Sequence, residues 1–284
     1  MWTPEKIAVI GLGRMGGGLT RNLAGRFDVT VFDIDAEATA RCGPDVVPAE
    51  TAVAAVMDAD LVVTSLPLPE HVLATYRDVE RHLRPKAVVM DTSTIDPRTA
   101  SELASIVGND RYVACSLGKG PAQAEAGEVP LFVGGPEPVL DDLEPVFACI
   151  GSTVHRLGSV EAATAFKIVS NLVGLTNLAV LAEGYALCRR AGVRDEAFSR
   201  ALADTGGWSA QAELRLPWMI DDDFSPRFSV DLGLKDLGLA VSMAATWGIP
   251  TPVGAAGMAQ LAHAAAHGHG AADVAAVLRV VAPG

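Results

Sequence analysis

Short runs of apolar, mostly β-branched residues alternate with longer amphipathic segments in the first half of the chain. Runs that are apolar on both faces, separated by helix-length segments, are typical of a mostly parallel sheet covered by helices on both sides. The expected strands are KIAVIG (6–11), VTVFD (29–33), LVVTSL (61–66), AVVMDT (87–92), YVACSL (112–117), LFVGG (131–135) and TVHRL (153–157). The pattern predicts a doubly wound α/β fold.

Strand patterns stop after about residue 160. Residues 163–192 read as one long helix that ends in a basic turn and Gly192. Further helices are expected at 195–204, 207–219, 230–247 and 254–267. We therefore predict an α/β domain over residues 1–160 and an all-helical domain over 161–284. The apolar stretch 172–188 contains Thr176, Asn177 and Glu183, so we expect a buried helix and no membrane span.

A glycine-rich turn follows the first expected strand and opens a helix. Glycines in such a turn allow a tight bend, close approach of the backbone to a pyrophosphate, and close helix–strand packing. The alternative is a purely structural turn, but the context and the acid Asp33, 22 residues beyond Gly11, favour a Rossmann-type dinucleotide site. Its residues are Gly11, Leu12, Gly13, Arg14, Met15 and Gly16.

Asp33 also predicts which cofactor is preferred. A carboxylate at the end of the second strand accepts hydrogen bonds from the adenine-ribose hydroxyls and repels a 2′-phosphate. The stretch Asp33-Ile34-Asp35 has two acids and no arginine. We expect NAD to be preferred over NADP.

One lysine, Lys167, lies in the apolar stretch TAFKIVSNLVG with Asn171 one helical turn further on. Both side chains fall on one helix face, so a bound molecule could touch both. A lysine whose pKa is lowered by apolar surroundings can take up and return a hydroxyl proton near neutral pH. The alternative is a lysine whose stem lies along the surface while its ammonium reaches water.

Together these motifs resemble the β-hydroxyacid dehydrogenases, the 3-hydroxyisobutyrate dehydrogenase-like family. The resemblance rests on IAVIGLGRMG, TSLPLPEHV (64–72), DTSTIDP (91–97), the Lys167/Asn171 helix and F…LKDLGLA (228–240). It implies NAD(P)-dependent interconversion of a short β-hydroxyacid and its semialdehyde or keto acid. It also implies assembly into a homodimer or homotetramer through the helical domain.

The resemblance assigns roles by position. Lys167 becomes the catalytic lysine, and Asn171 binds substrate. Thr92, Ser93 and Thr94 contact the nicotinamide end and the acid group of the substrate. Leu66 and Pro67 line the cofactor, and Lys235, with Asp236, closes over it.

The substrate loop SLGKGPAQAEAG departs from the usual family pattern. Gly118 stands where relatives have a serine that holds the substrate carboxylate, and Lys119 stands at the following glycine, before Gly120. A Gly–basic pair resembles the loop of the sulfolactaldehyde reductases. An ammonium with neighbouring amides suits a small anionic substrate, carboxylate or sulfonate. The alternative is that Lys119 points into solvent from the loop tip.

Charge and cysteine content narrow the remaining possibilities. The chain has 22 basic and 34 acidic residues, a net charge of −12, which argues against nucleic acid or an anionic membrane as the main partner. Four scattered cysteines, with no metal-type spacing and no secretory signal, indicate a cytoplasmic protein with reduced thiols. The histidines in HAAAHGHG (263–270) fit a solvated helix end better than a metal site, so no metal is expected.

Two other functions remain open from the sequence. An imine reductase would use NADPH and usually replaces the lysine by an acid or a tyrosine. A non-catalytic scaffold that binds the cofactor would generally lose the lysine. Lys167 argues against both, and Asp33 argues against NADPH.

Overall fold

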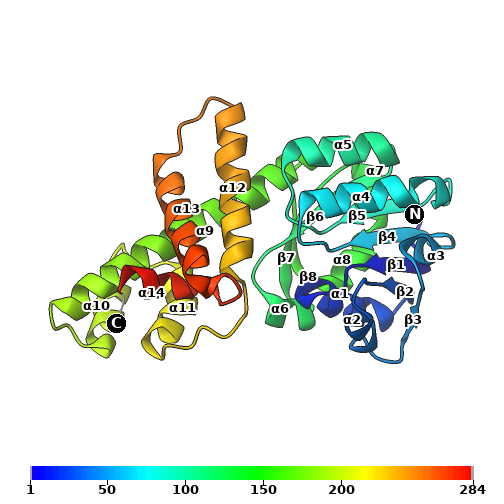
Figure 1. Cartoon of the computed structure of the whole chain (residues 1–284). Coiled ribbons are helices and arrows are strands. Elements are labelled where there is room, and N and C mark those ends of the chain that lie inside the picture. Colours follow the sequence, from blue (N-terminus) through cyan, green and yellow to red (C-terminus); the bar gives the residue numbers. More distant parts are fainter. Residues whose placement is uncertain (1, 283–284) are drawn as a thin grey trace. The chain divides into compact units, whose positions relative to one another are not determined.

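A computed structural model describes residues 2–282. It divides the chain into two compact units, one ending at Lys167 and one beginning at Ile168. The long helix α9 (Val160–Arg190) begins in the first unit and continues into the second (Figure 1).

The first unit is built on one eight-stranded sheet in the order β3-β2-β1-β4-β5-β6-β7-β8. All neighbouring strands are parallel except β6 and β7, which are antiparallel. The prediction of a doubly wound, mostly parallel sheet is therefore confirmed. The strands are β1 (Lys6–Ile10), β2 (Asp28–Phe32), β3 (Val46–Pro48), β4 (Leu61–Thr64), β5 (Val88–Asp91), β6 (Tyr112–Leu117), β7 (Val129–Gly134) and β8 (Gly151–Arg156).

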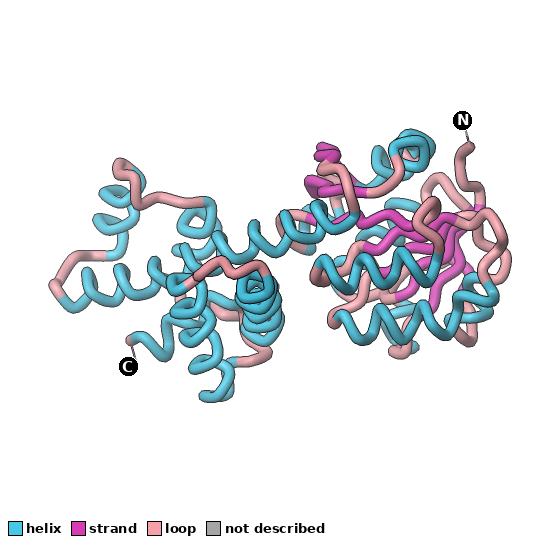
Figure 2. The backbone as a smooth tube through the Cα atoms, turned by 90° about the horizontal axis from the view of Figure 1, so that it is seen from above, coloured by secondary structure: helices cyan, strands magenta, loops and turns pink. Residues whose placement is uncertain are grey.

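Helices cover both faces of this sheet (Figures 1 and 2). Alternate residues of one strand point to opposite faces, so Ile7 and Val9 enter one apolar core and Ala8 and Ile10 the other. The first core includes residues of α1 (Arg14–Ala24), α6 (Pro121–Glu125), α7 (Glu137–Asp142) and α8 (Glu144–Ile150). The second includes α3 (Ala52–Val56), α4 (Pro69–Val79) and α5 (Pro97–Val107).

In the described part of the second unit, helices pack around a third apolar core. The helices expected from the sequence are present, with boundaries shifted by a few residues. They are α10 (Asp195–Ala203), α11 (Ala210–Ile220), α12 (Val230–Thr246) and α13 (Pro252–Ala264), followed by short turns and α14 (Leu278–Val281). Leu178, Tyr185 and Leu237 are among the residues that fill this core.

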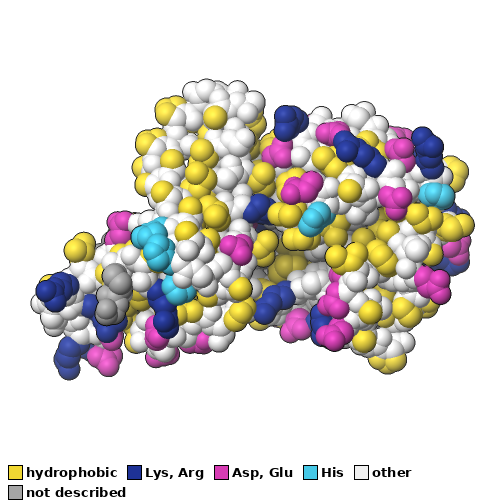
Figure 3. Space-filling model, in the orientation of Figure 1, with side chains coloured by type: hydrophobic (Ala, Val, Ile, Leu, Met, Phe, Trp, Pro, Cys, Tyr) yellow, Lys and Arg dark blue, Asp and Glu magenta, His cyan; other side chains and the backbone are white. Residues whose placement is uncertain are grey.

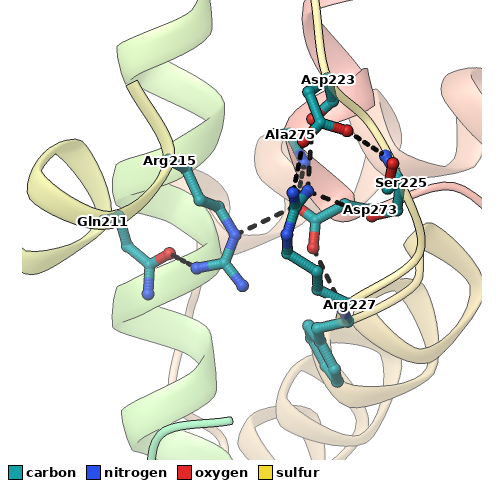
Figure 4. A network of polar contacts seen from close by, with 8 residues as sticks. Gln211, Arg215, Asp223, Ser225, Arg227, Asp273 and Ala275 are labelled. Carbon is teal, nitrogen blue, oxygen red and sulfur yellow. Dashed lines mark hydrogen bonds and ion pairs between the residues drawn. The ribbon is translucent and has the colours of Figure 1, made fainter. Parts of the chain in front are cut away.

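A buried ion pair joins α11 to the C-terminal part of the second unit (Figure 4). Arg215 Nε lies 3.3 Å from Asp273 Oδ1, and Asp273 is fully buried. Asp273 also accepts hydrogen bonds from the amides of Phe228 and Ala275, both at 3.0 Å. A buried carboxylate needs such partners because its charge is costly to remove from water. Asp273 therefore holds three segments of the unit together.

α9 is only partly buried, which corrects the expectation of a buried helix. Leu175, Leu178 and Tyr185 lie in the core, but Val173, Val180 and Leu187 are 54, 59 and 71 % exposed. By length and composition α9 is the single helix in residues 2–282 that could cross a membrane, and about 33 % of its most apolar window is buried. Hydrophobic side chains also lie on the surface of α12 and α13 (Figure 3), where Val253 is exposed.

Candidate active site

The three glycines of the turn after β1 meet different surroundings. Gly11 has φ +93°, a conformation that favours glycine. A Cβ on Gly16 would lie 2.0 Å from the carbonyl oxygen of Gly11, so the start of α1 packs directly on the turn. A Cβ on Gly13 would meet nothing within 4 Å. The turn is therefore tight at Gly11, packed at Gly16 and open at Gly13.

The open space at Gly13 lies at the start of α1. Gly13 is the N-cap residue, and as a glycine it has no side chain that could cap the helix. The first amides of a helix lack intrahelical partners and carry a partial positive charge, so they bind anions. The strand order also reverses between β1 and β4, where ligands of doubly wound folds bind. These residues fit the pyrophosphate of a dinucleotide.

Asp33 lies beside this turn, immediately after β2. Its Oδ2 accepts a hydrogen bond from the amide of Leu12 at 2.6 Å, and its Oδ1 accepts one from the amide of Asp35 at 2.9 Å. Gly13 and Arg14 are exposed, and Met15 is half-buried. The structure thus brings the predicted acid and the predicted glycine turn together.

The segments after β4 and β5 also meet at this edge of the sheet. The amide of Leu66 donates to Ser93 Oγ at 2.9 Å. Thr92 Oγ1 donates to the carbonyl oxygen of Thr64 at 2.8 Å. Thr92 and Ser93 are buried, Thr94 is half-buried and Pro67 is exposed. Five of the predicted residues, Leu66, Pro67, Thr92, Ser93 and Thr94, are thereby placed in two adjacent loops.

A further residue at this edge, Asp91, was not singled out from the sequence. It is the last residue of β5 and is 2 % exposed. Its Oδ1 accepts hydrogen bonds from Thr64 Oγ1 and Ser93 Oγ, both at 2.7 Å. The sequence signal was an acid at the end of a run that is otherwise apolar.

The substrate loop begins where β6 ends. Gly118 is buried, and a Cβ there would lie 2.6 Å from Pro130 Cγ, so a serine at this position requires Pro130 to move. Lys119 has φ +58° and is exposed. Gly120 is the N-cap residue of α6.

Lys167 is half-buried on α9, at the end of the first unit. Its neighbour Phe166 packs on Phe132 of β7, with 4.8 Å between the ring centroids. Phe132 also bounds the space beside Gly118, because a Cβ there would lie 3.2 Å from Phe132 Cε2. Two aromatic rings thus connect the Lys167 turn to the substrate loop within the first unit.

Asn171 and Lys235 meet at one carboxylate of the second unit. Asn171 Nδ2 donates to Asp236 Oδ2 at 2.5 Å, and Lys235 Nζ lies 2.8 Å from Asp236 Oδ1. Asp236 is 2 % exposed. Because a carboxylate can only accept, it fixes the amide of Asn171 with its NH₂ group toward Asp236. The structure therefore groups two predicted residues around an acid that sequence reasoning named only as their neighbour.

Two large apolar residues of α11 and the histidines near the C-terminus lie in other surroundings. Met219 is buried in the core of the second unit, and Trp218 packs under Arg227, whose Cζ lies 4.0 Å from the ring centroid. His263 and His267 stack edge to face at 4.3 Å. Within residues 2–282, no group of three or more histidine, cysteine, aspartate or glutamate side chains is arranged to hold a metal ion.

Family models match nearly the whole chain. The model described as the NAD-binding domain of 6-phosphogluconate dehydrogenase matches residues 6–158. The model described as the NAD-binding of NADP-dependent 3-hydroxyisobutyrate dehydrogenase matches residues 162–281. The chain belongs to the β-hydroxyacid dehydrogenase family. As a β-hydroxyacid dehydrogenase it is an oxidoreductase that uses a nicotinamide cofactor.

Individual relatives cover almost the full length of this dehydrogenase. A 2-(hydroxymethyl)glutarate dehydrogenase of Eubacterium barkeri is 30% identical over 97% of this chain and 94% of its own. A 3-sulfolactaldehyde reductase of Escherichia coli is 29% identical over 97% and 95%. The solved structure of a Mycobacterium tuberculosis 3-hydroxyisobutyrate dehydrogenase with L-serine has a TM-score of 0.90 at 28% identity, covering 99% of both chains.

Proposed function

We propose that this dehydrogenase interconverts a short β-hydroxyacid and its semialdehyde or keto form, with Lys167 as the general acid/base. The observation that carries the proposal is the turn before α1. It combines open space at Gly13, an uncapped helix start and a fixed carboxylate at Asp33. The residues expected from the family resemblance to touch substrate supply the rest of the proposal.

The chemistry assigned to the chain is a proton transfer. A nicotinamide, when bound, accepts the hydride from the hydroxyl-bearing carbon or supplies it to the carbonyl carbon. In oxidation the Lys167 amine takes the hydroxyl proton, and in reduction its ammonium returns that proton to the carbonyl oxygen. As an ammonium it also polarises that oxygen. Asn171 would orient the substrate beside it.

We further propose that NAD is preferred over NADP. Asp33 is held by two backbone amides, so its carboxylate has a fixed orientation at the end of β2. A carboxylate there accepts from ribose hydroxyls and repels a 2′-phosphate. The contacts with the cofactor that the family resemblance implies for Thr92 and Lys235 are part of the same proposal.

The substrate we propose is a small anion held by the loop at Gly118, Lys119 and Gly120, together with Thr94. Lys119 occupies a left-handed backbone conformation, which costs a non-glycine residue about 1 kcal/mol. Strain of this kind is tolerated at binding sites. The names of the relatives, 3-sulfolactaldehyde reductase and 2-(hydroxymethyl)glutarate dehydrogenase, describe anionic substrates of those proteins.

A substrate screen tests this proposal. The probes are 3-hydroxyisobutyrate, L-serine, 3-sulfolactaldehyde and 2-(hydroxymethyl)glutarate, each with the NAD and the NADP couple. Loss of a charge-assisted contact in Lys119→Ala should raise KM for the preferred anion at least about tenfold. Lys86→Ala, at another exposed lysine, is the control. Absence of turnover on every probe would contradict the proposed function, and an unchanged KM would exclude Lys119 from it.

For the assembly, we propose a homodimer or homotetramer formed through the helical unit. Exposed Val173, Val180 and Leu187 recur every seven residues on α9, so they form one apolar stripe. A sedimentation experiment that finds a monomer at micromolar concentration would contradict this. The four unpaired cysteines support a reducing, cytoplasmic location.

A further inference from the structure

Two neighbouring strands of the first unit deliver hydroxyl groups to one buried carboxylate. Thr64 and Asp91 are register partners at the ends of β4 and β5. Asp91 Oδ1 accepts from Thr64 Oγ1 and Ser93 Oγ at 2.7 Å, and from the Ser93 amide at 3.2 Å. The phenol oxygen of Tyr76 lies 2.9 Å from Thr64 Oγ1. All of these side chains are buried.

The direction of each bond follows from the single proton that a hydroxyl carries. Thr64 gives its proton to Asp91, so the bond between Tyr76 and Thr64 has the phenol as donor. Ser93 also gives its proton to Asp91. Its oxygen then accepts from the amide of Leu66 at 2.9 Å. The Ser93 hydroxyl is therefore engaged on both sides by groups of the protein itself.

We propose that Ser93 and Asp91 are positioning residues that hold the Leu66 segment, and that Ser93 does not donate to the acid group of the substrate. This rests on the proposed function, in which Leu66 and Pro67 line the cofactor. It revises the role that the family resemblance assigned to Ser93.

The Leu66 segment lies against the glycine turn, so its position affects the turn directly. A Cβ on Gly11 would lie 2.4 Å from the carbonyl oxygen of Ser65 and 2.9 Å from Leu66 Cδ2. Asp91 thus acts through Ser93 on Leu66, and Leu66 borders Gly11. Of the three consecutive residues 92–94, Thr94 is the one that is not buried, and we assign contact with the substrate to it.

The test separates cofactor binding from substrate binding. NADH affinity is measured by fluorescence titration without substrate, and KM for the best hydroxyacid of the panel is measured at saturating NAD. Ser93→Ala leaves the Leu66 amide without its acceptor, so the NADH dissociation constant should rise about fivefold or more. KM for the hydroxyacid should stay within about twofold. Ser93→Thr keeps the hydroxyl and should restore NADH affinity.

Tyr76→Phe is the matched control. It removes the outermost hydroxyl of the same network but leaves the bonds from Thr64 and Ser93 to Asp91 in place. Its NADH dissociation constant should stay within about twofold of the wild type, although its melting temperature falls. A purely structural network would make the two variants behave alike. Should Ser93→Ala not fold, Ser93→Cys keeps the side-chain size with a weaker acceptor, and the same rise is expected.

Unchanged NADH affinity in Ser93→Ala would overturn the proposal. A tenfold rise in KM for the hydroxyacid at unchanged NADH affinity would also overturn it and return Ser93 to the substrate. The NADH titration needs no turnover, so it decides this proposal even if none of the hydroxyacids is a substrate.

Discussion

The amide of Leu12 donates a hydrogen bond to the carboxylate of Asp33, with 2.6 Å between N and Oδ2. This bond links the glycine turn after β1 to the end of β2. It fixes the orientation of the acid before any ligand binds, which supports the proposed preference for NAD.

Replacing Asp33 should therefore change which cofactor binds. In Asp33→Ala the ribose hydroxyls lose their acceptor and the 2′-phosphate loses its repulsion, so the ratio of NADPH to NADH dissociation constants should fall at least about tenfold. Asp35→Ala is the control, because it removes the other acid of this segment. The side chain of Asp35 instead caps α2 (Ala36–Ala40) by accepting a hydrogen bond from the Glu37 amide. An unchanged ratio in Asp33→Ala would refute the proposed preference.

Alanine substitutions at two glycines of the turn should have different effects on stability and on NADH binding. Gly16→Ala places a Cβ 2.0 Å from the Gly11 oxygen, so the free energy of unfolding should fall by about 2 kcal/mol. Gly13 has φ −60° and open space, so Gly13→Ala should cost less than about 1 kcal/mol without ligand. Its Cβ occupies the approach to the helix start, and NADH binding should weaken at least about tenfold. Similar stability and affinity for both variants would contradict this.

Two buried tyrosines of one core provide another matched pair. The phenol of Tyr76 is hydrogen-bonded to Thr64, whereas that of Tyr112 has no hydrogen-bond partner among the described residues. Tyr76→Phe should lower the free energy of unfolding by about 1 kcal/mol, and Tyr112→Phe should leave it unchanged or raise it. Urea denaturation measures both. A larger loss in Tyr112→Phe would show that its hydroxyl has a partner.

The same two phenols should make the free energy of unfolding depend on pH in alkaline solution. Burial, and then the charge of Asp91, raises the pKa of Tyr76 and of Tyr112 well above the usual value. The contribution of the neutral phenols to stability is therefore fully present below pH 10, where tyrosine is also neutral in the unfolded chain. Above pH 10 it should fall by up to about 1.4 kcal/mol per pH unit for each phenol. Urea denaturation from pH 8 to 11 measures the free energy of unfolding at each pH. In Tyr112→Phe this free energy should fall less steeply with pH than in the wild type. An equally steep fall would contradict the prediction.

Sequence reasoning succeeded where a local pattern fixes the structure. The strand before Gly11 and the spacing to Asp33 were sufficient to predict the turn and its acid, because both follow from one βαβ unit. The three-residue strand β3 was missed, since it is short and contains Pro48. Edge strands of that kind leave little signal.

Other features depend on long-range contacts that the sequence does not reveal. From the sequence, Asp91 is only the last residue of an expected strand. Its pairing with Thr64 in the sheet shows that its carboxylate accepts hydrogen bonds from hydroxyl groups. The exposed stripe on α9 was not visible, because the helix is apolar on most of its faces. The hydrogen bond between Asp236 and Asn171, 65 residues apart in the chain, could likewise not be predicted from local sequence.

The central claim is that Lys167 exchanges the substrate proton. It is tested most directly by kcat of Lys167→Ala with NAD and the best hydroxyacid of the panel, with Lys86→Ala as control. General acid–base catalysis contributes about 100-fold or more, so kcat should fall by at least that factor while NADH affinity stays within about twofold. A kcat within tenfold of the wild type would contradict the account.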